Sequence, residues 1–127
     1  MCILIQDEIA INVGALGDLI FEKGHYLYVG SAMGHSGSST LLNRVKRHTS
    51  PSSSKNIHWH IDYLLNNTNS LITLIYLIPS SQRLECEIAR TISNISQDSI
   101  KNFGSSDCDC YSHLFYFKEF SSFKELY

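Results

Sequence analysis

The sequence contains no apolar run of the roughly 18 residues that a membrane-spanning helix needs. Its N-terminus also lacks the basic, apolar and small-residue order of a secretory signal. We therefore expect a cytoplasmic protein with no membrane partner. A length of 127 residues excludes two full domains, and 43% hydrophobic residues are enough for one core.

Acidic residues are missing from a long central stretch, although the formal charge of the whole chain is only -2. Between Lys23 and Ile61 there is no Asp or Glu, while five of the ten Lys and Arg residues and five of the six His lie there. The remainder sets all 12 acids against five bases, a formal -7 beside a +5 segment. This asymmetry indicates a polyanionic partner, with a solvated basic face as the alternative.

Cysteine is too scarce for a disulfide-stapled fold in a chain with a real core, so the four thiols are expected to be reduced or to act as ligands. Cys108, Cys110 and His113, together with Cys86, offer soft ligands for Zn²⁺. The Cys-x-Cys-x-x-His order departs from the usual two-residue zinc spacing, however. Small buried thiols in a tight loop are therefore the favoured interpretation, and zinc is the alternative.

Segments with strand character open the sequence at residues 2–6, 9–13 and 24–32, and three in succession predict a meander. Residues 71–78 form a continuous apolar run that predicts a buried strand, and residues 114–117 predict a last strand. Residues 103–113 are rich in Gly, Ser, Asp and Cys and are expected to be irregular.

Helical spacing predicts one helix over residues 41–48, with Ser39 or Thr40 as its N-cap, and another over residues 84–95. A short helix is expected to open near His58, and the tail beyond residue 117 is expected to be helical. Strands followed by helices around one more strand predict an α+β fold. We expect a single domain over 1–127, in which helices flank a small, mainly antiparallel sheet.

Chemistry is suggested first by the strand that ends in Tyr28, Val29 and Gly30, followed by a helix that carries Arg44. A glycine lets the backbone approach a ligand closely, and an arginine can fork onto a phosphate. Tyrosines in strands are usually packing residues, which is the alternative interpretation of Tyr28.

Five blocks in collinear order resemble the GIY-YIG nuclease superfamily, most closely its small prokaryotic domains that are sometimes fused to endonuclease III-type glycosylases. The blocks are residues 28–32, 41–48, 58–64, 85–86 and 103–115. The resemblance implies a GIY-YIG-like fold and metal-dependent endonuclease activity on the phosphodiester bonds of nucleic acid, with DNA as the expected substrate. It further implies a role in DNA repair and a possible glycosylase partner.

The resemblance also assigns roles to individual residues. It implies that Tyr28 positions or deprotonates the attacking water, that Arg44 stabilises the phosphoryl charge, and that Glu85 binds Mg²⁺ or Mn²⁺, with Glu87 as the alternative register. His48 is a further catalytic candidate on the arginine helix. A tyrosine needs nearby cations to act as a base, because its free pKa is about 10.

The basic segment supplies the candidates for binding nucleic acid: Arg47, Lys46, His58 and His60. His58 and Asp62 are four residues apart and would share a helix face. They could contact phosphate, bind a metal, or form a satisfied hydrogen-bonded pair.

One position departs from the GIY-YIG pattern. The tyrosine of the first motif half should precede an Ile-Leu-Ile run, here residues 3–5, and Cys2 stands in its place. Tyr26 lies two residues before Tyr28, on the same strand face, and could compensate. The alternative function is therefore a non-catalytic nucleic-acid binding module, and a third possibility is an interaction domain built on the Cys108, Cys110 and His113 ligands.

Overall fold

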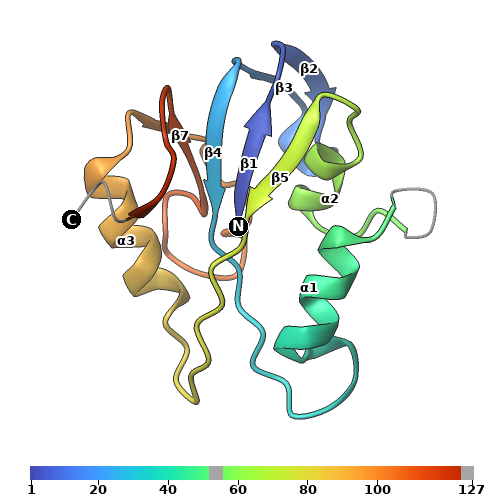
Figure 1. Ribbon diagram of the computed structural model, residues 1–127, viewed down its shortest axis with the longest axis vertical. Helices are drawn as coiled ribbons and strands as arrows, with labels where there is room; N and C mark the ends of the chain where they lie inside the picture. The colour runs from blue at the N-terminus through green and yellow to red at the C-terminus, as the bar shows by residue number, and fades with distance from the viewer. Residues whose placement is uncertain (52–55, 124–127) are drawn as a thin grey trace.

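The computed structural model describes residues 1–51 and 56–123, and its fold is α+β, as the sequence predicts. The main sheet has antiparallel strands in the order β5-β1-β4-β7-β6. These strands are β1 (Cys2–Ile5), β4 (Gly24–Tyr28), β5 (Ser70–Leu74), β6 (Asp98–Ser99) and β7 (Leu114–Phe117). Helix α3 (Glu85–Ile95) lies on one side of the sheet, while α2 (His60–Leu65) and α1 (Leu41–Thr49) lie on the other side (Figure 1).

A separate two-stranded sheet interrupts the expected meander. It pairs β2 (Ile9–Asn12) with β3 (Asp18–Phe21), and β1 pairs with β4 instead of β2, so the predicted meander is wrong. Gly14 and Gly17 have φ angles of 51° and 76° and close the connection between β2 and β3. The resulting hairpin packs its apolar side chains against one face of the main sheet.

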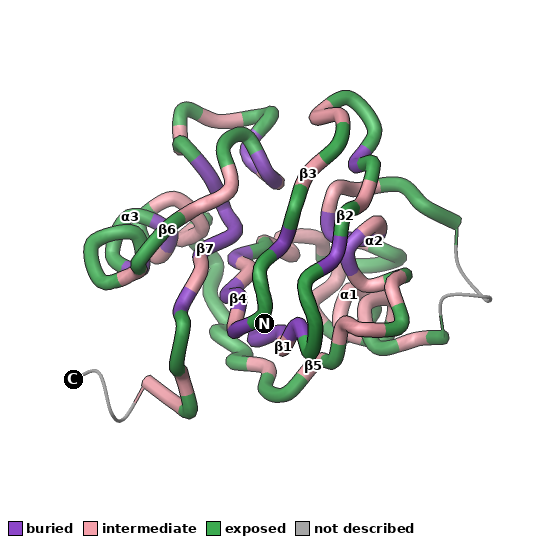
Figure 2. Tube along the Cα trace, turned by 90° about the horizontal axis from the view of Figure 1, so that it is seen from above, coloured by how far each residue is buried: buried purple, intermediate pink, exposed green. Residues whose placement is uncertain are grey.

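The two faces of the sheet carry two buried cores, because successive strand residues point to opposite sides. One core joins the sheet to α2 and to the β2–β3 hairpin: Ile3, Ile5, Tyr26, Phe21, Val13, Ile61 and Leu64. The other joins it to α3: Cys2, Leu27, Val29, Phe115, Ala89 and Ile92. Figure 2 shows the buried positions following the central strands between the layers.

The helices begin close to their predicted starts. Thr40 is the N-cap of α1, as predicted, and its hydroxyl accepts a hydrogen bond from Asn43 N at 3.2 Å. Helix α2 begins at His60, later than expected, because the Asp62 carboxylate binds the backbone N–H groups of His58 and Trp59 outside the helix.

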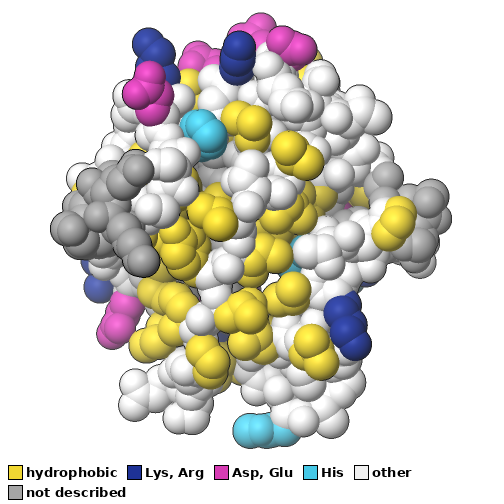
Figure 3. Space-filling view, in the orientation of Figure 1, with side chains coloured by type: hydrophobic (Ala, Val, Ile, Leu, Met, Phe, Trp, Pro, Cys, Tyr) yellow, Lys and Arg dark blue, Asp and Glu magenta, His cyan; other side chains and the backbone are white. Residues whose placement is uncertain are grey.

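The apolar run at residues 71–78 is not the buried strand that we predicted. Strand β5 ends at Leu74 and lies at the edge of the sheet, and Leu71 and Leu77 are 50% and 55% exposed. A run of apolar residues does not tell a central strand from an edge strand, which explains the error. Figure 3 shows hydrophobic side chains gathered over the middle and lower part of this view.

The remaining elements complete the sheet and its surroundings. Strand β7 is confirmed, whereas the two-residue β6 is too short to leave a sequence pattern. Residues 118–122 are irregular rather than helical, and residues 124–127 of the tail, like Lys55, lie outside the described residues. Within the described ranges, no helix combines the length and apolar character needed to cross a membrane.

Candidate functional site

A cleft of about 340 Å³ opens beyond the end of β4, between the start of α1 and the start of α3, and is lined in part by Tyr28, Tyr76 and Glu85. An adjoining hollow of about 80 Å³ shares Tyr28 and Tyr76 and adds Arg44 and His48. The structure therefore brings together three of the predicted catalytic side chains and the predicted metal ligand.

The ring of Tyr28 is held between two glycines. A Cβ atom added at Gly30 would lie 2.9 Å from Tyr28 Cε2, and one added at Gly104 would lie 3.1 Å from Tyr28 Cε1. Both distances are shorter than ordinary van der Waals contact. His48 and Phe103 meet the same ring edge-on, with centroid distances of 6.2 and 6.4 Å. These contacts fix the orientation of the phenol.

The electrostatics of Tyr28 favour its neutral form. Burial raises the pKa of Tyr28 above its ordinary value, and the negative charge of Glu85 raises it further, while the charge of Arg44 acts in the opposite direction. Tyr28 is therefore a phenol at neutral pH. In that form it can donate a hydrogen bond to a water molecule or to a phosphate oxygen.

Arg44 stands over an aromatic side chain at the edge of the cleft. Its guanidinium carbon lies 4.2 Å from the centroid of the Trp59 ring, which is a cation–π contact. Within the described part of the chain, the buried Nε of Arg44 has no hydrogen-bond partner. Trp59 thus positions a permanent positive charge beside Tyr28.

Arg47 serves mainly to tie α1 to α2. Its Nη2 donates to Asp62 Oδ2 and to the carbonyl of Asn56, both at 2.7 Å, and its guanidinium carbon lies 5.3 Å from the Trp59 ring. Burial of Asp62 raises its pKa, but the hydrogen bonds from Trp59, His58 and Arg47 outweigh this effect and leave the pKa below its ordinary value. Arg47 is therefore engaged within the protein.

The histidines proposed for nucleic-acid binding have different environments. His60 Nδ1 accepts a hydrogen bond from Gly104 N at 2.9 Å, and burial lowers the pKa of His60. It therefore supports the loop that packs on Tyr28. His58 is exposed, as is Lys46 on α1. For the His58 and Asp62 pair, the hydrogen bond comes from the backbone N of His58 at 2.9 Å.

Glu85 is the first residue of α3 and lines the cleft, whereas Glu87 is exposed and lines a different hollow, one without Tyr28. The Glu85 side chain is 10% exposed, and its Oε1 lies 3.2 Å from His113 Nδ1. Carboxylate oxygens of Glu85 and Asp107 and the Cys108 sulfur lie within 4.8 Å of one another.

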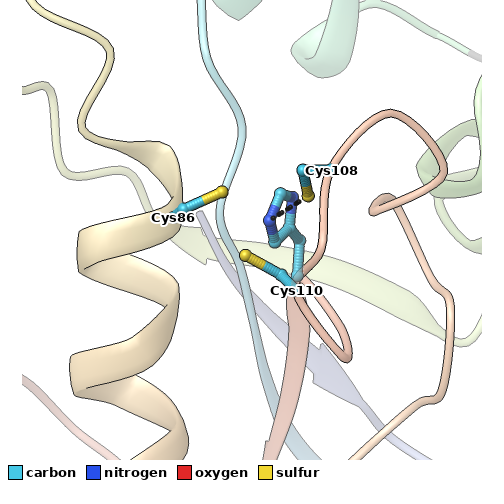
Figure 4. A group of neighbouring side chains, drawn as sticks. Cys86, Cys108 and Cys110 are labelled. Atoms are coloured by element: carbon cyan, nitrogen blue, oxygen red, sulfur yellow. Dashed lines mark hydrogen bonds between the residues drawn. The ribbon is translucent and has the colours of Figure 1, made fainter.

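Three thiols and an imidazole gather beside Glu85. The ligand atoms of Cys86, Cys108, Cys110 and His113 lie within 4.8 Å of one another, and Cys108 Sγ is 3.5 Å from His113 Nε2. Figure 4 shows the labelled thiols of Cys86, on α3, and of Cys108 and Cys110, on the facing loop, converging on one point. Burial, followed by hydrogen bonds with Cys86 and Cys108, raises the pKa of Cys110 to about 12.

Two residues that the GIY-YIG resemblance brings into question, Tyr26 and Cys2, lie away from this cleft. Tyr26 shares the strand face of Tyr28, but it is 2% exposed and its hydroxyl donates to the carbonyl of Glu22 at 3.0 Å. Cys2 is 1% exposed and packs with Leu27 in the core under α3. Neither residue lines the cleft, so the structure does not support compensation by Tyr26.

Sequence reasoning missed three parts of the site. Tyr76 lines both hollows, but it lay within the run that we interpreted as a buried strand. Trp59 lies within the block at residues 58–64, and its contact with Arg44 joins α1 to the start of α2. The Glu85–His113 contact joins residues that are 28 positions apart, and no local sequence pattern predicts it.

The fold and the site define a small α+β domain with a cleft, lined in part by Tyr28 and Glu85, next to a thiol and imidazole cluster. The chain belongs to the family described as domain of unknown function DUF123, whose model matches residues 1–127. No curated protein and no solved structure matches the chain.

Proposed function

We propose that this protein is a metal-dependent endonuclease that hydrolyses phosphodiester bonds in nucleic acid, with DNA as the first substrate to test. The observation that carries the proposal is the position of Tyr28, between Arg44 of α1 and Glu85 of α3. The resemblance to GIY-YIG nucleases supports the same conclusion. We further propose that the protein acts in the cytoplasm, takes part in DNA repair and works together with a DNA glycosylase.

The residues around the cleft divide the chemistry among them. Arg44 binds the phosphate and stabilises the charge that develops on its oxygens. Tyr28, as a neutral phenol, orients the attacking water through a hydrogen bond. His48 contacts the Tyr28 ring edge-on and limits the orientations that the phenol can adopt. Lys46 and His58 are exposed and available to the flanking backbone.

The carboxylates of Glu85 and Asp107 suit a hard divalent cation. Glu85 and Asp107 bring carboxylate oxygens together, and such oxygens are the ligands that Mg²⁺ and Mn²⁺ prefer. Glu85 would hold the ion with Asp107 beside it. When bound, the ion would assist water activation and stabilise the leaving oxygen.

The second candidate function is a nucleic-acid binding module without catalysis. The burial of Cys2 favours it, because the side chain in the position of the first-motif tyrosine faces the core under α3. In this case Arg44 and Lys46 would still bind phosphates, and Glu85 would have no metal-dependent role.

The two candidates are separated by cleavage and binding assays on labelled duplex, single-stranded and branched DNA and on matching RNA. We expect cleavage that requires Mg²⁺ or Mn²⁺. Tyr28→Phe and Glu85→Gln should each lower its rate at least about 100-fold. Glu87→Gln, on the exposed side of the same helix, is the matched control and should cut at the wild-type rate.

Binding without cleavage would favour the second candidate, provided that Arg44→Ala weakens the binding and Glu85→Gln does not. Absence of both binding and cleavage across these substrates would reject both functions.

A further inference from the structure

We infer that Cys86, Cys108, Cys110 and His113 bind one Zn²⁺ ion. The four ligand atoms lie within 4.8 Å of one another, and they come from two separate segments, the first turn of α3 and the loop before β7. Three thiols and one imidazole at this distance from one another make up the Cys₃His ligand set found in structural zinc sites. The inference does not depend on the proposed reaction, although Glu85 belongs to both sites.

The spacing of the four atoms fits a tetrahedral ion with little rearrangement. Sulfur ligands stand about 2.3 Å from Zn²⁺, which places neighbouring sulfurs about 3.8 Å apart in a tetrahedron. The observed limit of 4.8 Å exceeds this by an amount that small side-chain rotations can remove. Thiolate and imidazole ligands favour Zn²⁺ over Mg²⁺, which takes oxygen ligands. The cluster and the Glu85–Asp107 carboxylates therefore select different ions.

His113 has the second partner that a zinc-binding histidine usually has. Its Nε2 faces Cys108 Sγ at 3.5 Å, inside the cluster, and its Nδ1 faces Glu85 Oε1 at 3.2 Å, outside it. The Nδ1 proton can be donated to the carboxylate, which leaves the Nε2 lone pair for the metal. Glu85 is thus a positioning residue for the zinc site.

The proposed ion would join two segments that are far apart in the sequence, α3 and the loop before β7. The loop that supplies Cys108 and Cys110 also contains Gly104, which packs against Tyr28, and α3 contributes Cys86 next to Glu85. A metal bridge between them would fix the loop that packs on Tyr28 relative to the helix that carries Glu85. Binding would release the thiol protons to solvent, since thiolates are the ligands.

The test uses the full chain, expressed with zinc in the medium and purified without chelators. We expect elemental analysis to find about one zinc per chain. Replacement by Co²⁺ should produce the thiolate-to-cobalt charge-transfer band and the d–d bands of a tetrahedral site. Cys86→Ser and Cys110→Ser should lose the metal, whereas Cys2→Ala, a thiol in the core under α3, should keep it.

Glu85→Gln should still bind one zinc, with an affinity lowered about 10- to 100-fold in competition with a chromophoric chelator. Because Cys→Ser variants can fail to fold, the cobalt spectrum of the wild-type chain decides independently. A folded wild-type chain that holds no zinc, takes up none and gives no thiolate–cobalt band would overturn the inference. Equal metal loss from Cys2→Ala and Cys86→Ser would overturn it as well.

Discussion

Replacing Asp62 by asparagine should loosen the contacts that hold α1 against the segment before α2. The Asp62 side chain is fully buried, and its Oδ2 accepts hydrogen bonds from Arg47 at 2.7 Å and from the backbone N of His58 and Trp59 at 2.9 Å. These bonds hold Trp59, and Trp59 in turn lies against Arg44. Asp62→Asn keeps the shape of the side chain and removes the charge.

The size of the effect follows from the burial of the pair. Breaking a buried ion pair from one side costs about 3–5 kcal/mol, because the remaining charge loses its partner. Arg47 is 27% exposed, and water can partly replace the carboxylate around it. The amide oxygen of asparagine can also still accept from one backbone N–H. We therefore expect a loss of about 2–3 kcal/mol in the free energy of unfolding.

The pH dependence provides a second, independent signature. Because the pKa of Asp62 in the folded chain lies below its ordinary value of 3.8, the unfolded state takes up the proton first. The stabilisation is complete above the ordinary value and is lost as the pH falls through the folded-state pKa. Asp62→Asn should lack this part of the acid destabilisation.

Urea unfolding followed by circular dichroism measures both effects, with Asp109→Asn, an exposed loop position, as the matched control. A double-mutant cycle with Arg47→Gln should give a coupling energy above about 1 kcal/mol. A loss below 1 kcal/mol for Asp62→Asn, with the acid limb unchanged, would refute the reasoning.

Three further outcomes are expected. Gly104→Ala should destabilise the protein by at least about 1 kcal/mol more than Gly37→Ala in urea unfolding. Both positions have positive φ, but only at Gly104 would an added Cβ press against Tyr28. Equal losses would contradict this. In an alkaline titration followed by phenolate absorbance, the wild-type curve minus the Tyr28→Phe curve should show no step near pH 10, because the pKa of Tyr28 is raised. A step near pH 10 in that difference curve would be contrary evidence. Arg44→Ala should reduce the salt slope of DNA binding by about one, and an unchanged slope would remove Arg44 from the phosphate contacts.

The local elements were the most predictable part of the fold. The helix after Thr40 carries its cap signal and apolar spacing within a few residues, and the strand at residues 114–117 is a short apolar run after an irregular loop. Pairing was harder, because β1 and β4 are joined only after an intervening hairpin. The exposure of Leu77 depends on the edge position of β5, which no local pattern encodes.

The candidate site divides in the same way. The resemblance implies roles for Tyr28, Arg44 and Glu85, and in the structure Tyr28 lines two adjoining hollows, one of which includes Glu85 and the other Arg44. The resemblance could not show that Glu85 also contacts His113, because that contact depends on how the loop before β7 meets α3. The spacing of these ligands along the chain argues against zinc. Cys86 meets Cys108 and Cys110 only because the fold packs α3 against the loop, and no spacing along the chain indicates this.

Glu85 connects the two proposals and makes them separable in one experiment. Its Oε1 contacts His113, and the same side chain lines the cleft beside Tyr28. If zinc fixes His113, its removal should disturb Glu85 while leaving Arg44 on Trp59, at the other wall. We therefore expect selective zinc chelation in the presence of excess Mg²⁺ to lower kcat and leave DNA binding within about twofold. Equal losses of binding and kcat would mean that zinc maintains the whole fold, whereas no loss of either would uncouple zinc from the cleft.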